Sequence, residues 1–201
     1  EQETFQASVR VYAAEVLRQR AKGKPAMFSY NLGPHEPQPG AVADVEALIE
    51  AVMVPRTEYV ARIAEAVNAE FLVPFAGEAD ILANAPAFRE LPAVERVQHV
   101  QHLVDRVRET ARANFSGKLV GLSAWQYYPP NDGFWSSAPM DQVSWQGFDY
   151  VSFTLLPVTF NNCSVDFTRG FFQAQLAKID ELSRRDGFQW LIVELDIFTF
   201  G

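Results

Sequence analysis

Five short apolar runs, separated by helix-like segments, constrain the fold of this chain more than any other feature. The runs lie at 26–30, 71–75, 119–124, 148–156 and 188–193. Each is apolar along its length, as expected for a strand that is buried on both faces of a parallel sheet. Parallel strands need long crossover connections, which are usually helices. The pattern therefore predicts an α/β fold with a parallel sheet.

The segments between the runs show helical periodicity, and we expect helices at about 4–22, 43–53, 57–68, 93–114 and 168–185. Pro55 interrupts the second helical stretch, so two consecutive helices or one kinked helix fit equally well. The expected order is one helix, four strand–helix units and a final strand. No linker or repeat divides the chain, and we expect a single domain over residues 1–201.

This pattern alone fits both a doubly wound sheet and a barrel. No glycine-rich phosphate loop follows any of the five runs, which disfavours a nucleotide-binding doubly wound sheet. The net charge of −8 argues against nucleic acid or an anionic membrane surface as a partner. No apolar run approaches the roughly 20 residues of a membrane span. Nothing in the sequence indicates a cofactor, and nothing assigns a compartment.

Two glutamates follow the second and fifth apolar runs. Glu78 comes three residues after Phe75, and Glu194 comes directly after Val193. In a parallel barrel, side chains at the C-terminal ends of the strands converge on one pocket. A pair of carboxylates in such a pocket is the equipment for cleaving a glycosidic bond. We therefore expect Glu78 and Glu194 to be catalytic.

Three segments resemble the clan of retaining glycoside hydrolases built on the (β/α)8 barrel, which includes cellulases, β-mannanases and β-galactosidases. Residues 71–80 are similar to the fourth strand of that clan with its acid/base glutamate, 148–153 to the sixth strand, and 191–194 to the seventh strand with its nucleophile. The resemblance implies a partial TIM barrel in which the visible strands are numbers 3–7, without the first two strands and the last. It also implies an oligo- or polysaccharide substrate, with Glu78 as acid/base and Glu194 as nucleophile.

The chain departs from that clan at one catalytic position. Gly77 stands where an asparagine usually holds the 2-hydroxyl group of the sugar. A catalytically weak or inactive carbohydrate-binding barrel is therefore one alternative, and another kind of α/β-barrel enzyme is a second, because fold does not fix function. The length of 201 residues is also below the roughly 250 of a complete barrel.

Other residues follow the same strand ends and are expected to contact the substrate. They are Asn31, His35, Asp80, Trp125, Tyr127, Tyr128, Trp135 and Asp196. Aromatic rings offer flat apolar faces for stacking on sugars, although a loop that packs on itself would look the same. Asp80 could instead cap a helix, and Trp145 could belong either to this wall or to the outer packing of the barrel.

His99, His102 and Asp105 share one face of the helix expected at 93–114. Such spacing can bind a metal ion, but no second cluster of ligands is evident along the chain. The sequence therefore predicts no metal site.

Overall fold

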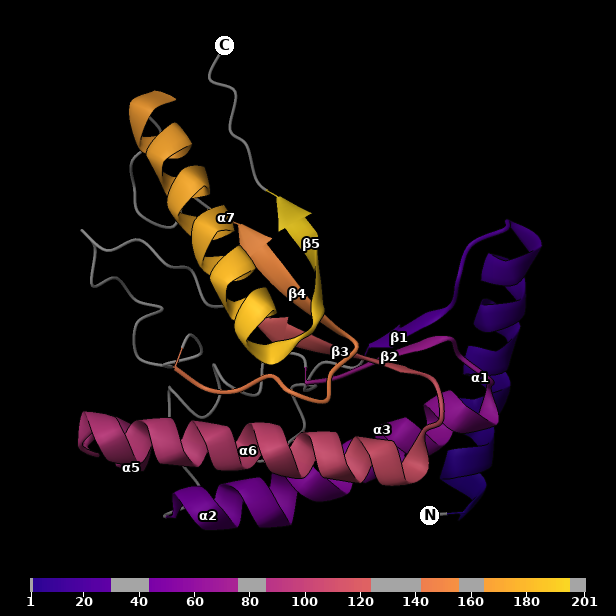
Figure 1. Ribbon diagram of the computed structural model, residues 1–201. Coiled ribbons are helices and arrows are strands. Elements are labelled where there is room, and N and C mark those ends of the chain that lie inside the picture. Colours follow the sequence, from indigo (N-terminus) through magenta and orange to yellow (C-terminus); the bar gives the residue numbers. More distant parts are fainter. Residues whose placement is uncertain (1, 30–43, 76–85, 124–141, 156–164, 196–201) are drawn as a thin grey trace.

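The computed structural model describes residues 2–29, 44–75, 86–123, 142–155 and 165–195. Its centre is a five-stranded parallel sheet in the order β1-β2-β3-β4-β5 (Figure 1). The strands are β1 (Met27–Ser29), β2 (Phe71–Phe75), β3 (Lys118–Ser123), β4 (Tyr150–Leu155) and β5 (Gln189–Leu195). The predicted α/β fold with a parallel sheet is confirmed.

The longer helices occupy the predicted segments with small changes at their ends, and the short helix α5 was not predicted. They are α1 (Gln2–Ala21), α2 (Val45–Leu48), the π-helix η2 (Ile49–Met53), α3 (Val54–Ala66), α5 (Pro86–Arg89), α6 (Ala93–Asn114) and α7 (Val165–Asp186). None of the helices in the described ranges combines the length and apolarity that a bilayer-spanning segment needs.

Residues 45–66 form one continuous helical stretch. Of the two arrangements left open at Pro55, the structure therefore has the single helix and not two separate helices. Pro55 is the second residue of α3, and it has no N–H group to donate to the preceding turn. The wider π winding of η2 comes directly before it, and such an insertion is one of the common ways in which a helix absorbs an irregularity.

The two faces of the sheet are packed very differently. On one face, strand residues such as Leu72, Leu119 and Val151 share a single large core with buried residues of the helices. On the other face, Val73 and Val120 form a separate small cluster with Phe71 and Tyr150, and all four of these residues come from strands. Neighbouring strand residues point to opposite faces, so the described helices all cover the same face.

Only the last part of the connection from β3 to β4 lies within the described residues. The described residues 142–149 contain turns and bends but no helix. Trp145 from this segment is fully buried in the large core, with its ring 5.5 Å from that of Phe148. It fills the space over Gly121, where an added Cβ would lie 2.7 Å from the Trp145 ring. Trp145 therefore belongs to the outer packing.

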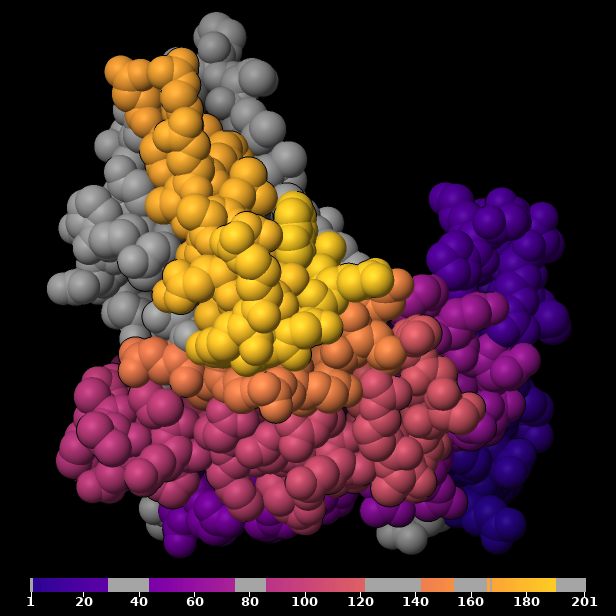
Figure 2. Space-filling model, viewed as in Figure 1, coloured from indigo at the N-terminus to yellow at the C-terminus, as the bar shows by residue number. Residues whose placement is uncertain are grey.

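The segment 142–149 is held between α6 and α7, where the space-filling view shows it as a thin orange layer (Figure 2). Gln101 of α6 accepts a hydrogen bond from the backbone N–H of Ser144 at 2.6 Å. Asp186, the last residue of α7, accepts one from the backbone N–H of Trp145 at 2.7 Å. These contacts tie the irregular segment to both helices.

Candidate functional site

All five strands run in the same direction, so their C-terminal ends lie along one edge of the sheet. This edge is where ligands bind in parallel α/β folds. The sheet order separates β2 from β5 by two strands. With a spacing of about 4.8 Å between strands, β2 and β5 are roughly 14 Å apart along the sheet. Groups that follow these two strands can meet only if the sheet curves.

Glu194 lies within β5 and not just after it, which corrects the expected strand end. Its Cα partner in β4 is Thr154, and the last pair is Leu155 with Leu195. The register shifts between Phe153 and Thr154, where β5 carries one extra residue, Val193. This irregularity lets β5 continue pairing beyond its apolar run. Bulges of this kind are common beside active sites, where they redirect a side chain.

The strand that leads toward Glu78 is also irregular at its C-terminal end. Between Leu72 and Phe75, β2 has one residue more than the matching part of β3. The extra length includes Pro74, which has no N–H group to donate to a neighbouring strand. β2 ends at Phe75, three residues before Glu78.

Most of the predicted site lies outside the described residues. This applies to Glu78 and to all the expected substrate contacts: Asn31, His35, Asp80, Trp125, Tyr127, Tyr128, Trp135 and Asp196. The roles assigned to them, and the role of Glu194, remain predictions.

The sheet face that carries Val73 and Val120 is apolar. Val120 is fully buried and Val73 nearly so, and the Phe71 and Tyr150 rings meet edge to face at 5.9 Å. Ser152 is 1% exposed, and its hydroxyl group donates a hydrogen bond to the carbonyl oxygen of Gly121 at 3.0 Å. The one buried hydroxyl among these residues is therefore satisfied by the neighbouring strand.

At the opposite, N-terminal end of the strands, Asp149 joins three elements. It accepts hydrogen bonds from the Leu119 backbone N–H at 2.8 Å, from Arg112 at 2.6 Å and from Lys118 at 3.1 Å. Burial by itself would raise the pKa of the Asp149 carboxyl group. The hydrogen bonds outweigh burial and lower that pKa, with Arg112 contributing most. Asp149 is a structural anchor held in its charged form.

Glu70, which directly precedes β2, is a second carboxylate that anchors neighbouring elements. Its carboxylate accepts hydrogen bonds from the Ala26 backbone N–H at 2.6 Å and from Arg20 at 2.8 Å. Burial opposes ionisation of Glu70, but the hydrogen bonds from Ala26 and Arg20 lower its pKa. This carboxylate fixes the end of α1 to the beginning of the sheet.

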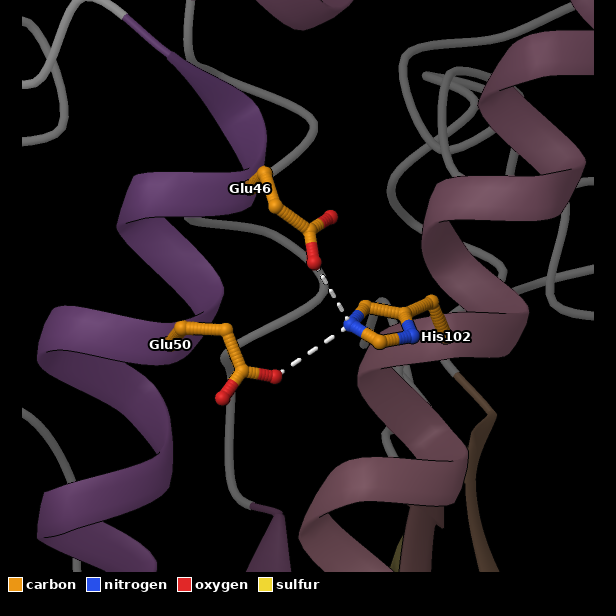
Figure 3. A group of neighbouring side chains, drawn as sticks. All are labelled: Glu46, Glu50 and His102. Atoms are coloured by element: carbon orange, nitrogen blue, oxygen red, sulfur yellow. Dashed lines mark ion pairs between the residues drawn. The ribbon is translucent and has the colours of Figure 1, made fainter.

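A third cluster of polar groups lies between the helical stretch 45–66 and α6, and sequence analysis missed it. Glu46 and Glu50 meet His102 there, with their carboxylate oxygens 2.9 and 3.3 Å from its Nε2 atom (Figure 3). Asp105, expected on the same face as His102, instead pairs with Arg108 at 2.8 Å. The spacing of Glu46 and Glu50, four residues apart, was the available signal, but their meeting with α6 is a tertiary contact.

A hollow that described residues line lies elsewhere, between α1 and α3. It has a volume of about 710 Å³ and is lined by Gln2, Thr4, Phe5, Gln6, Tyr59 and Arg62. Arg62 lies over the Phe5 ring, 5.2 Å from its centroid. The described residues that line this hollow include no carboxylate, histidine or cysteine.

No protein-family model and no curated protein matches this chain. Among solved structures, a GH113 β-1,4-mannanase matches with a TM-score of 0.46 and 15% sequence identity. The match covers 92% of this chain and 50% of the mannanase chain. The chain therefore spans about half the length of that solved structure.

Proposed function

We propose that this chain is part of a retaining glycoside hydrolase, and that β1–β5 are strands 3–7 of a (β/α)8 barrel. The strand order supports the barrel, because each strand pairs with the next one along the chain and the described helices cover one face. A doubly wound sheet reverses its strand order at a switch point and places helices on both faces. A parallel sheet whose strands follow one another in chain order can close into a barrel.

The open edges of the sheet fit the same proposal. Among the described residues, β1 pairs only with β2 and β5 only with β4, and Met27 and Trp190 on these two edge strands are 47% and 40% exposed. Native proteins avoid uncovered apolar strand edges. We therefore expect further barrel strands, from the same protein, to pair with β1 and β5.

The observation that carries the proposal is the position of Glu194 at the C-terminal end of β5, in a parallel sheet whose β2 leads toward Glu78. In this proposal Glu194 attacks the anomeric carbon and forms a glycosyl–enzyme bond as the glycosidic bond breaks. Glu78 gives its proton to the leaving oxygen and later takes a proton from the water that releases the sugar. The chemistry requires the two carboxyl groups to lie about 5–5.5 Å apart.

The remaining predicted contacts take supporting roles in the proposal. The four aromatic residues Trp125, Tyr127, Tyr128 and Trp135 stack on sugar rings, and Asn31, His35, Asp80 and Asp196 bind sugar hydroxyl groups. Gly77 offers no side chain for the 2-hydroxyl group, so one of these polar residues must replace the usual asparagine.

The test compares two variants of the full-length protein on aryl glycosides. Glu194→Gln removes the nucleophile and should abolish turnover of all of them. Glu78→Gln should spare the first step for good leaving groups, which need little protonation, but should slow attack by water. Added azide should then partly restore turnover of Glu78→Gln and not of Glu194→Gln.

Glu181→Gln is a suitable control because Glu181 is an exposed carboxylate on α7 that pairs with Lys178. It should leave turnover unchanged. Equal and mild losses from Glu78→Gln and Glu194→Gln would instead indicate a carbohydrate-binding wall without covalent chemistry, and the proposed mechanism would be wrong.

A further inference from the structure

The Glu46, Glu50 and His102 side chains converge on one point between two helices. Glu46 and Glu50 come from α2 and η2, His102 comes from α6, and the three side chains point toward one another (Figure 3). One oxygen of each carboxylate and the His102 Nε2 atom all lie within 4.8 Å of one another. This arrangement brings two anionic oxygens and an imidazole nitrogen to the same small space.

His102 meets the two carboxylates in ion-pair contacts and without a well-aligned hydrogen bond. Its Nε2 atom is shielded from solvent and has no hydrogen-bond partner of acceptable geometry, although the two carboxylate oxygens lie 2.9 and 3.3 Å away. An imidazole N–H group points along one direction and cannot align well with both oxygens at once. Atoms that bind one metal ion at about 2.1 Å are themselves about 3.0–3.4 Å apart. The 3.3 Å separation from Glu50 falls in that range, the 2.9 Å separation from Glu46 is slightly shorter, and the two carboxylate oxygens lie within 4.8 Å of each other.

Neighbouring side chains support the cluster in the way that outer groups support metal ligands. Arg106 donates hydrogen bonds to both oxygens of Glu50, at 2.7 and 3.0 Å. The hydrogen bond from Arg106 is the largest cause of a lowered pKa at Glu50, so this carboxylate is charged at neutral pH. Each carboxylate oxygen has a second lone pair, which leaves Glu50 able to bind a cation. His99 lies 3.9 Å from the other oxygen of Glu46.

We propose that Glu46, Glu50 and His102 form a Zn²⁺ site that ties η2 to α6. One imidazole nitrogen and two carboxylate oxygens are ligands that zinc accepts, whereas Mg²⁺ and Ca²⁺ prefer oxygen alone. Three protein ligands leave one position of a tetrahedral ion for water. The site is independent of the proposed glycosidase chemistry, since none of its residues belongs to the strand ends.

The test measures zinc binding to the full-length protein after treatment with a chelator and buffer exchange. Titration of ZnCl₂ at pH 7, followed by calorimetry, should show a site that His102→Gln and Glu46→Gln each weaken at least tenfold. Zinc should also raise the unfolding temperature of the wild-type protein and not that of either variant. Excess Mg²⁺ should not displace the zinc.

Glu58→Gln is the matched control, because Glu58 is an exposed glutamate of the same helical stretch that pairs only weakly, with Arg62 at 3.8 Å. It should bind zinc as the wild type does. Any other zinc site on the protein persists in all variants, so the difference between variants is the measurement. If His102→Gln folds poorly, Glu46→Gln decides, since the Glu46 side chain is 51% exposed. Equal zinc binding by the wild type and both variants, or none by the wild type, would show that the cluster is only an ion-pair network.

Discussion

The two ends of the parallel strands use carboxylates in different ways. At the N-terminal end, Glu70 and Asp149 each accept hydrogen bonds from a backbone N–H group and from cationic side chains, and their pKa values are lowered. At the C-terminal end, Glu194 follows a register shift and the apolar run 190–193 of β5. In barrels, residues at the N-terminal end serve stability and those at the C-terminal end serve catalysis. The position of an acidic residue before or after a strand is therefore more informative than its residue type.

The largest expected effect is on enzymatic activity, and it distinguishes the C-terminal end of the strands from the N-terminal end. Glu194→Gln should lower the hydrolysis of an aryl glycoside by about 10³-fold or more, with little change in stability. Glu70→Gln, at the opposite end, should leave turnover within about twofold at temperatures well below unfolding. Rates and unfolding temperatures of both variants check this, and a similar loss of activity in both would remove the distinction.

The next effect concerns stability. Asp149→Ala leaves the Leu119 N–H group and two cations without their partner, in a site where the Asp149 side chain is 22% exposed. We expect a loss of about 2–3 kcal/mol in the free energy of unfolding. Urea denaturation followed by circular dichroism measures it. A loss below about 0.5 kcal/mol would mean that Asp149 is not an anchor.

The sequence predicts those features of the structure that leave a local pattern in the chain, and it does not predict those that depend on contacts between distant segments. The apolar run 71–75 and the periodic segment 93–114 give the bounds of β2 and α6 directly, because burial on both faces or on one helical face leaves its own pattern. The end of β5 was misplaced because a register shift carries pairing past Val193. Trp145 left two readings open, since a buried ring and a substrate-binding ring look alike in sequence. The contact of Glu46 with His102 was missed because it joins segments 56 residues apart.

A smaller effect is the pH dependence that the anchors produce. A carboxyl group whose pKa is lowered on folding stabilises the protein above its unfolded-state pKa of about 4, and this stabilisation is lost as pH falls through the folded-state pKa. Wild-type stability should therefore fall below about pH 4. Asp149→Asn should show a shallower fall, so that the two urea midpoints converge toward low pH. Parallel curves for the two proteins would contradict the lowered pKa of Asp149.

The smallest effect is expected for an exposed ion pair on the surface, which joins a carboxylate to an arginine as the anchors Glu70 and Asp149 do. Glu15 accepts hydrogen bonds from Arg18 and Gln19, which lower its pKa to about 2. Both members of the Glu15–Arg18 pair are about half exposed, so solvent screens their attraction. Glu15→Gln should leave the unfolding temperature unchanged within error. A clear drop would show that pairing alone, without burial, stabilises this fold.

The central proposal is that Glu194 is a nucleophile at the C-terminal end of the sheet. It is tested most directly by treating the full-length protein with dinitrophenyl 2-deoxy-2-fluoro glycosides of glucose, mannose and galactose. The fluorine slows release of the covalent intermediate that a retaining enzyme forms, so the labelled protein can be digested and its peptides analysed by mass spectrometry. We predict a mass increase of one fluoroglycosyl group on the peptide that contains Glu194, and none in Glu194→Gln. A label on any other residue, or no label on a protein that hydrolyses the unfluorinated glycosides, would contradict the account.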